Sequence, residues 1–255
     1  MMNNREFLIV AHRGESFDAP ENTMAAISLA WERGAEAVEI DVHLSLDHKV
    51  VVIHDFNTKR LAGVSKIIKD QSVDELKRLD VGSWKDIKWK GEQIPTLKEV
   101  LNSIPDEKKL VIEIKSEASI IPHLKNEIEQ SGLSSEQIEL IGFDIKTMAL
   151  TKKEFQDHKV LWLLDLDYLW INRIFKPSIG RAIAKAKKFG LDGLNVWAGT
   201  MLTKKMIDEI HANNLLVYCW TVNDILKAKT LIGWGIDAIT TDGAQWLSSH
   251  LIENR

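Results

Sequence analysis

Acidic and basic side chains gather at the ends of two short apolar runs of the sequence. Glu39 and Asp41 lie two residues apart in one run, and Glu113 and Lys115 lie two residues apart at the end of another. Side chains two apart share one face of a β-strand, so each pair points the same way. Three carboxylates brought together would resist ionisation without a compensating cation. We therefore expect Glu39, Asp41 and Glu113 to hold one divalent cation, with Mg²⁺ or Ca²⁺ preferred by all-oxygen ligands.

Two histidines follow other apolar runs and provide acid and base chemistry. His12 is followed by Arg13, and His54 comes at the end of the run 50–53. Cleavage of a phosphodiester needs a base for the attacking oxygen and an acid for the leaving alkoxide, and histidine can serve as either near neutral pH. Three carboxylates, one divalent cation, Arg13 and Lys115 carry a net charge of about +1, which suits a singly charged phosphodiester.

The elements that must position these groups alternate between strands and helices. Eight short apolar runs predict strands at residues 7–11, 37–42, 110–114, 138–142, 160–164, 193–196, 215–219 and 238–241. Amphipathic segments between them predict helices that include 23–33, 122–130, 145–155, 179–189 and 204–212. This order favours a (β/α)8 TIM barrel, whose active site lies where strands end. The alternative is an open doubly wound sheet, but no glycine-rich G-x-G-x-x-G turn follows the first run.

An insertion of about residues 43–94 interrupts the alternation after the second strand. Residues 50–53 predict a hairpin extension of that strand around the turn 47–49, and residues 56–94 read as a polar, irregular excursion over one end of the barrel. Thr96 and Glu99 have the spacing of a capping box, which predicts a helix over 96–102. No low-complexity linker divides the chain, so we expect residues 1–255 to form a single domain.

Composition excludes several classes of protein. The formal net charge is −4, which argues against nucleic-acid binding through bulk positive charge. Cys219 is the single cysteine, so no internal disulfide or multi-cysteine zinc site is expected. The sequence contains no apolar run of 18 residues, so no transmembrane helix is expected. The first six residues are polar, so no signal peptide is expected and a cytoplasmic location is favoured. The oligomeric state stays open.

Taken in order, these segments resemble the signature of the glycerophosphodiester phosphodiesterase family. The matching segments extend from residue 11 to residue 242 and read A-H-R-G (11–14), P-E-N-T (20–23), E-I-D-V (39–42), H-D (54–55), E-I-K (113–115), W-T-V-N (220–223) and T-D (241–242). H-R-G alone would be a weak signal, whereas the ordered set is specific.

The resemblance implies a (β/α)8 barrel and metal-dependent hydrolysis of a glycerophosphodiester to an alcohol and glycerol 3-phosphate. It also implies roles for individual residues: metal ligands at Glu39, Asp41 and Glu113, an acid/base pair at His12 and His54, phosphate-side cations at Arg13 and Lys115, and an aromatic wall at Trp220. In this family's proposed chemistry a glycerol hydroxyl attacks phosphorus and gives a cyclic intermediate. We expect His12 to be the base and His54 the acid.

Some residues have simpler interpretations or depart from the family pattern. We interpret Asn22 or Thr23 as the N-cap of the first helix, and we do not assign Glu21 to the site. Gly14 is expected to allow a tight turn. The fourth strand ends in G-F-D at 142–144, where the family often has Ser-Phe. Two residues after Asp242, where the family usually has proline, this chain has Ala244. Both departures concern the shape of the pocket.

Two other functions remain open. A lysophospholipase D would use the same site on lipids and would need an apolar channel, formed by residues 56–94 or near Trp170. A non-catalytic barrel could bind a phosphorylated ligand, although it would have no need of paired acid/base groups. In every case the expected partner is a small phosphodiester or phosphate compound. The histidines at positions 43, 48, 123, 158, 211 and 250 lack such a context and are expected to be surface or structural residues.

Overall fold

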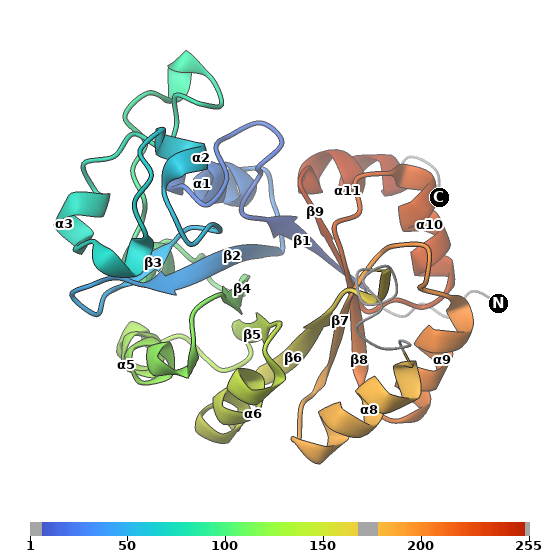
Figure 1. Cartoon of the computed structure of the whole chain (residues 1–255). Helices are drawn as coiled ribbons and strands as arrows, with labels where there is room; N and C mark the ends of the chain where they lie inside the picture. The colour runs from blue at the N-terminus through green and yellow to red at the C-terminus, as the bar shows by residue number, and fades with distance from the viewer. Residues whose placement is uncertain (1–6, 168–177, 253–255) are drawn as a thin grey trace.

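The computed structural model describes residues 7–167 and 178–252, and it shows a closed barrel of parallel strands (Figure 1). The sheet runs in the order β1-β9-β8-β7-β6-β5-β4-β2-β3, and a parallel pairing of β1 with β2 closes the cylinder. This closure confirms the (β/α)8 barrel and rules out the open sheet. The strands are β1 Leu8–His12, β2 Ala37–Leu44, β3 Val50–Val52, β4 Lys109–Ile114, β5 Ile138–Gly142, β6 Lys159–Leu164, β7 Gly193–Trp197, β8 Leu216–Trp220 and β9 Ala238–Thr241. Trp170 lies outside the described residues.

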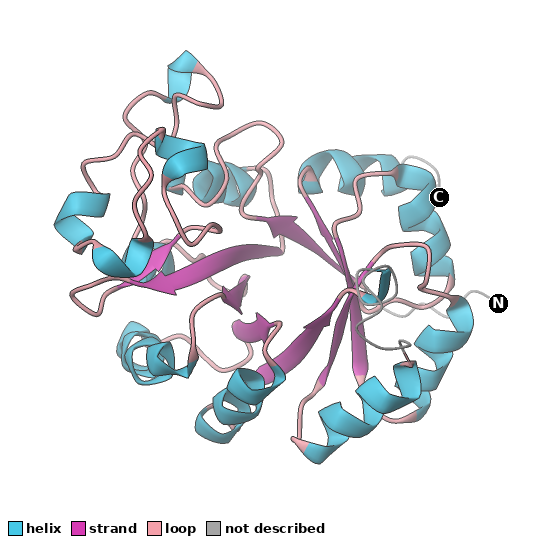
Figure 2. Cartoon of the chain, viewed as in Figure 1, coloured by secondary structure: helices cyan, strands magenta, loops and turns pink. Residues whose placement is uncertain are grey.

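Helices surround the barrel on its outer side (Figure 2). They are α1 Met24–Glu32, α5 Ile121–Ser131, α6 Ile145–Glu154, α8 Ile179–Lys188, α9 Lys204–Ala212, α10 Ile225–Gly233 and α11 Ala244–Ile252. Each helix that the sequence predicted by range ends within one residue of its expected bounds. Side-chain caps explain several of the helix starts: Thr23, Asp144 and Thr203 each accept a hydrogen bond from a backbone N–H in the first turn.

Two separate apolar layers hold the barrel, one on each side of the strands. Val38, Ile40 and Val42 of β2 pack outward in a cluster with residues of the surrounding helices. Val10, Val111 and other inward side chains fill the interior. Because alternate residues of a strand face opposite sides, the residues between Val38, Ile40 and Val42 point into the barrel. The structure thus confirms that Glu39 and Asp41 face the interior.

Polar groups fill the interior of the barrel below the carboxyl ends of the strands. Glu139, near the start of β5, is buried and accepts a hydrogen bond from the Tyr218 hydroxyl at 2.9 Å. Lys159 and Lys109 lie 3.3 and 3.8 Å from the same carboxylate. The plug and the apolar layer around it fill the cylinder, as in other barrels of this kind.

The insertion after β2 has more structure than the sequence predicted. β3 pairs antiparallel with β2, as expected, and His48 takes a left-handed conformation (φ 58°) in the turn. Residues 56–94 were expected to be polar and irregular, but they form short helices around a small core of their own. The helices are α2 Lys59–Ala62, η1 Ile68–Asp70, α3 Val73–Leu76 and η2 Ile87–Trp89. The core consists of Val51, Ile53, Leu61, Ile68, Leu76, Val81 and Ile94. The sequence did not predict this core because the apolar residues of 56–94 have no regular spacing.

The helix that returns the chain to the barrel is α4 Leu97–Leu101. Its capping box is present: the Thr96 side chain accepts from the backbone of Glu99, and the Glu99 carboxylate accepts from the backbone of Thr96. This confirms the predicted helix start.

Candidate active site

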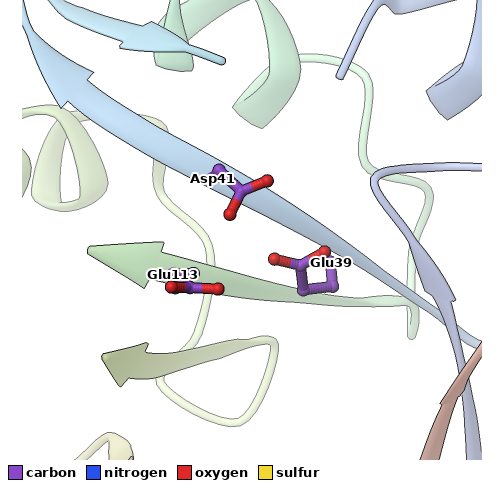
Figure 3. A group of neighbouring side chains, drawn as sticks. All are labelled: Glu39, Asp41 and Glu113. Atoms are coloured by element: carbon purple, nitrogen blue, oxygen red, sulfur yellow. The ribbon is translucent and has the colours of Figure 1, made fainter. Parts of the chain in front are cut away.

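Three buried carboxylates meet at the carboxyl end of the barrel (Figure 3). Glu39 and Asp41 project from β2 and Glu113 from β4, and the strand register places Asp41 directly beside Glu113. One carboxylate oxygen from each residue lies within 4.8 Å of the others, and the residues are 2%, 0% and 8% exposed. The predicted cluster of carboxylates therefore forms.

The carboxylates of this cluster differ in how easily they ionise. Burial, together with the neighbouring charges of Asp41 and Glu113, raises the pKa of Glu39 well above its ordinary value. Burial and Asp41 raise the pKa of Glu113 to about 7. Burial also opposes ionisation of Asp41, but the charges of Arg13 and Lys115 outweigh it and lower the pKa of that group. Two of the three carboxylates therefore resist ionisation, as acidic groups crowded together in a buried site do when no cation lies among them.

The donor set fits a hard divalent cation. Glu39 Oε1 is buried and has no hydrogen-bond partner among the described residues, so one oxygen of the cluster is left for a ligand. A buried charge without a partner is costly, and a cation among the three carboxylates would remove that cost. Glu39, Asp41 and Glu113 could hold Mg²⁺ or Ca²⁺, both of which prefer oxygen ligands.

His12, at the end of β1, stands beside this cluster. Its Nε2 lies 4.0 Å from Glu39 Oε2, and its Nδ1 lies 2.6 Å from Asp242 Oδ1. Asn223 and Ser16 donate hydrogen bonds to the same aspartate, at 2.6 and 3.3 Å. With Nδ1 bound to Asp242, the opposite ring nitrogen is free to exchange a proton on the cluster side. Asp242 entered the sequence argument only as part of a motif.

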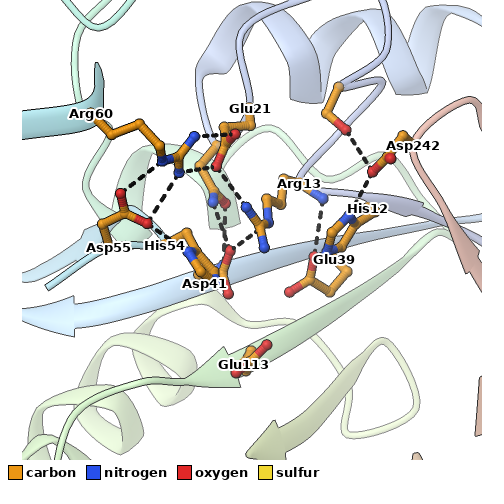
Figure 4. Close-up of polar contacts among 12 residues, drawn as sticks. His12, Arg13, Glu21, Glu39, Asp41, His54, Asp55, Arg60, Glu113 and Asp242 are labelled. Carbon is orange, nitrogen blue, oxygen red and sulfur yellow. Dashed lines mark hydrogen bonds and ion pairs between the residues drawn. The ribbon is translucent and has the colours of Figure 1, made fainter. Parts of the chain in front are cut away.

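His54 lies on the other side of the cluster from His12 (Figure 4). Its Nδ1 contacts Asp55 Oδ1 at 2.8 Å, so both imidazoles are held through Nδ1 by a carboxylate. Burial lowers the pKa of His54, which favours its neutral form. His43 has a structural contact, as expected: its Nε2 lies 3.1 Å from the backbone carbonyl oxygen of His54.

The two predicted cations also contact the cluster. Arg13 Nε lies 3.1 Å from Asp41 Oδ2, and the Arg13 backbone N–H donates to Glu39 at 3.0 Å. Lys115 Nζ lies 2.8 Å from Glu113 and 3.3 Å from Asp41. The turn that presents Arg13 has positive φ at Arg13 and at Gly14, and a Cβ on Gly14 would stand 2.5 Å from the Ala26 carbonyl carbon. Gly14 is therefore required for this turn, as predicted.

The segment P-E-N-T carries more of the site than the sequence analysis assigned to it. Of the two N-cap candidates, Asn22 and Thr23, the structure confirms Thr23 as the N-cap of α1. Asn22 Nδ2 donates to Asp41 Oδ2 at 2.8 Å, and its Oδ1 accepts from the Asp41 backbone N–H at 3.1 Å. Glu21, which we left unassigned, binds Arg13 Nη1 at 2.7 Å. Arg60, which no motif indicated, binds Glu21 and Asp55.

An aromatic group stands beside the polar site. The ring of Trp220, at the end of β8, packs edge-on against Trp197 and Phe143, with centroids 5.0 and 5.6 Å away. Lys115 Nζ lies 5.9 Å from the centre of the Phe143 ring. Phe143 follows Gly142, where the family often has serine, and it is exposed. Trp220 therefore belongs to a surface of three rings rather than standing alone.

The model of the glycerophosphoryl diester phosphodiesterase family matches residues 12–245, which is most of the chain. The chain belongs to this family. The family assignment makes the protein a glycerophosphodiester phosphodiesterase-type enzyme on a TIM barrel. No helix in residues 7–167 and 178–252 has the length and apolar character needed to span a bilayer.

Individual relatives in the family cover nearly the whole chain. The Bacillus subtilis protein YhdW is 34% identical over 92% of this chain and 93% of its own length. A glycerophosphodiester phosphodiesterase of Caldanaerobacter subterraneus is 30% identical over 94% of this chain and 96% of its own. The solved structure of an Oleispira antarctica phosphodiesterase with its product sn-glycerol-3-phosphate has a TM-score of 0.87, with 27% identity and coverage of 96% of both chains.

Proposed function

We propose that this protein hydrolyses glycerophosphodiesters to an alcohol and glycerol 3-phosphate, with a divalent cation and two histidines, in one catalytic domain. The observation that supports this most is the convergence of Glu39, Asp41 and Glu113 within 4.8 Å beside His12. The product named for the Oleispira antarctica relative, sn-glycerol-3-phosphate, supports the choice of substrate class.

The two histidines divide the proton transfers. In the first step His12, held by Asp242, takes the proton of the attacking glycerol hydroxyl, and His54, held by Asp55, gives a proton to the leaving alkoxide, which leaves a cyclic phosphate. In the second step water opens this cyclic phosphate to glycerol 3-phosphate, and the two histidines exchange the roles of acid and base. Each transfer contributes roughly 10²- to 10⁴-fold to the rate. When it is bound by the three carboxylates, a divalent cation supplies positive charge that polarises the phosphoryl group. The carboxylates on the two Nδ1 atoms fix the ring orientations and so direct each Nε2 to the reaction.

The cations and the rings bind the substrate. Arg13 and Lys115 are placed to offset negative charge on the non-bridging phosphate oxygens. Arg13 is suited to this because its planar guanidinium can bind two oxygens at once. The surface formed by Trp220, Trp197 and Phe143 provides an apolar wall for the carbon atoms of glycerol or of the alcohol.

Lysophospholipid hydrolysis is the second candidate, and exposed apolar side chains around the site favour testing it. Phe17, Phe56 and Ile87 are 72%, 66% and 73% exposed, on the loop after β1 and on residues 56–94. A human relative that is 27% identical to this chain, over 91% of the chain, is named a lysophospholipase D. An acyl chain could rest on such side chains while the same groups cleave the diester.

One activity screen tests both candidates. The chelated protein is assayed with glycerophosphocholine, glycerophosphoethanolamine and a lysophospholipid, each with no metal, Mg²⁺ or Ca²⁺. We expect metal-restored release of glycerol 3-phosphate from the glycerophosphodiesters. Turnover of the lysolipid alone would favour the second candidate, and full activity after exhaustive chelation would refute the metal requirement. Binding of glycerol 3-phosphate without turnover of any diester would favour a non-catalytic barrel.

A further inference from the structure

Arg60 links the excursion 56–94 to both sides of the active site, and nothing in the proposed mechanism yet uses it. Its guanidinium makes four hydrogen bonds to two carboxylates (Figure 4). Nη1 and Nη2 bind the two oxygens of Glu21, both at 2.8 Å. Nε and Nη2 bind the two oxygens of Asp55, at 2.8 and 3.2 Å. Such paired bonds fix the orientation of a carboxylate as well as its position.

Each of these two carboxylates holds a group that the proposed reaction needs. Asp55 binds Nδ1 of His54, the proposed acid, and Glu21 binds Nη1 of Arg13, the proposed phosphate ligand. A continuous chain of contacts therefore joins the two groups through Arg60, in the order His54, Asp55, Arg60, Glu21, Arg13.

We propose that Arg60 is a positioning residue that sets the orientation of His54 and the available charge of Arg13 at the same time. This inference rests on the proposed function. The charge argument concerns Glu21, a mostly buried carboxylate that lies between two guanidinium groups. With Arg60 present, the negative charge of Glu21 is shared between two guanidinium groups, so much of the positive charge of Arg13 remains available to a phosphate. Without Arg60, Glu21 would pair with Arg13 alone, offset more of its positive charge and draw its side chain away from the substrate.

The local fold explains why Arg60 can do this. It lies on α2, and its neighbour Leu61 is buried in the small core of the excursion. The Thr58 hydroxyl donates to the Val64 carbonyl at 2.6 Å and closes the loop around this helix. The small core thus anchors α2, and the paired bonds of Arg60 attach it to the barrel. A lysine could keep the charge but could not bind both carboxylates in this paired way.

The test compares Arg60→Ala and Arg60→Lys with Arg78→Ala, which removes an exposed arginine from the same excursion. We expect Arg60→Ala to lower kcat/KM about 10- to 100-fold, through kcat because His54 is misoriented and through KM because Arg13 is neutralised. Arg60→Lys should recover KM more than kcat, since it restores charge without the paired geometry. Arg78→Ala should behave as the wild type, and circular dichroism should show all three variants folded.

Double substitutions separate positioning from a general loss of structure. In Arg60→Ala, the further change Glu21→Gln removes the unbalanced carboxylate, so KM should move back toward the wild-type value. Added to Asp55→Asn, Arg60→Ala should cause little further loss of kcat, because it acts on His54 through Asp55. Independent, multiplying losses in both double variants would overturn the proposal, and so would wild-type kinetics in Arg60→Ala.

Two measurements without turnover keep the proposal separate from the proposed function. Calorimetry with glycerol 3-phosphate should show weaker binding to Arg60→Ala than to Arg78→Ala. Nitrogen NMR of His54 should show that its Nδ1 loses the hydrogen bond to Asp55 in Arg60→Ala. If the wild type cleaves no diester, the proposed function fails, but unchanged binding and an unchanged His54 spectrum are still needed to refute the role of Arg60.

Discussion

His12 Nδ1 lies 2.6 Å from Asp242 Oδ1, although 230 positions separate the two residues in the chain. The contact follows from the closure of the barrel, because β1 and β9 are neighbours and Ala11 pairs with Thr241. An imidazole held in this way presents one defined tautomer, with its free nitrogen directed at the carboxylate cluster. The pairing of the first and last strands thus brings the proposed proton-transfer group and its supporting carboxylate together.

Substitution of the supporting aspartate tests this contact. We expect Asp242→Asn to lower kcat about 10- to 100-fold, because an amide no longer fixes the imidazole tautomer. Ser16→Ala removes a longer, 3.3 Å bond to the same aspartate and should change kcat much less. Steady-state kinetics with a glycerophosphodiester measures both. Equal effects of the two substitutions would show that Asp242 does not orient His12.

The two histidines should differ in their response to the leaving group. His12→Ala and His54→Ala should each lower kcat at least about 10²-fold with an ordinary alcohol as leaving group. With a nitrophenol leaving group, which departs without a proton, His54→Ala should recover much of its loss and His12→Ala should not. The opposite pattern would exchange the base and the acid.

Metal binding at the three carboxylates should raise the unfolding temperature of the protein. Mg²⁺ or Ca²⁺ at 100 times its Kd should stabilise the wild type by about 2.7 kcal/mol, and a kcal/mol raises Tm by about 2–4 °C in a protein of this size. Glu39→Gln should abolish this shift. In metal-free buffer the same variant should melt higher than the wild type, since burial and neighbouring charges make the Glu39 carboxylate unfavourable. Scanning calorimetry with and without chelator measures both effects.

Stability in acid should depend on Asp55. Partial burial opposes its ionisation, but hydrogen bonds from Arg60 and His54 prevail and lower its pKa to about 2. Because the unfolded-state pKa is about 3.9, the stabilisation is complete above that pH and is lost as the pH falls toward 2. Asp55→Asn should therefore be less stable than the wild type at pH 7, and the difference should shrink between about pH 4 and pH 2.

Urea titrations across this range, with Asp106→Asn as an exposed loop control, measure the effect of Asp55. A difference between Asp55→Asn and the wild type that stays constant down to pH 2 would contradict the assigned ion pairing.

The interior plug should affect stability without affecting chemistry. Tyr218→Phe removes the hydroxyl that donates to Glu139 at 2.9 Å and should cost about 1.5–3 kcal/mol of unfolding free energy. Tyr218 is buried inside the barrel, so kcat and KM should stay close to the wild type. Denaturant unfolding and kinetics on the same sample check this. Loss of activity in a stably folded Tyr218→Phe would show that the plug reaches the catalytic end.

The regular parts of the molecule were predictable because their period is short. Alternation along 37–42 and 110–114 indicated that Glu39, Asp41 and Glu113 share one interior face, and the structure confirms this. Helix bounds followed from caps such as Thr96, whose bonds are local in sequence. Patterns of this kind depend on neighbours within four residues, so the sequence displays them directly.

The contacts that were missed are long-range. Asn22 has the residue type of a cap, and only the fold shows that its amide reaches Asp41 instead. Arg60 lies in a segment without periodicity, and its partner Glu21 is 39 positions away. The bond between Tyr218 and Glu139 spans 79 positions. Strand order and the path of the loops decide which polar side chains meet across such distances. Neither can be read from the local spacing of residues in the sequence.

The plug formed by Tyr218 and Glu139 also has a kinetic consequence. Because the cylinder is filled below the carboxylates, we expect substrate and products to pass over the carboxyl end of the barrel. On the proposed function, the alcohol would depart first, and glycerol 3-phosphate, held by the charges of Arg13 and Lys115, would depart last. The retained product then obstructs the next molecule of substrate, so accumulated glycerol 3-phosphate should slow the enzyme competitively.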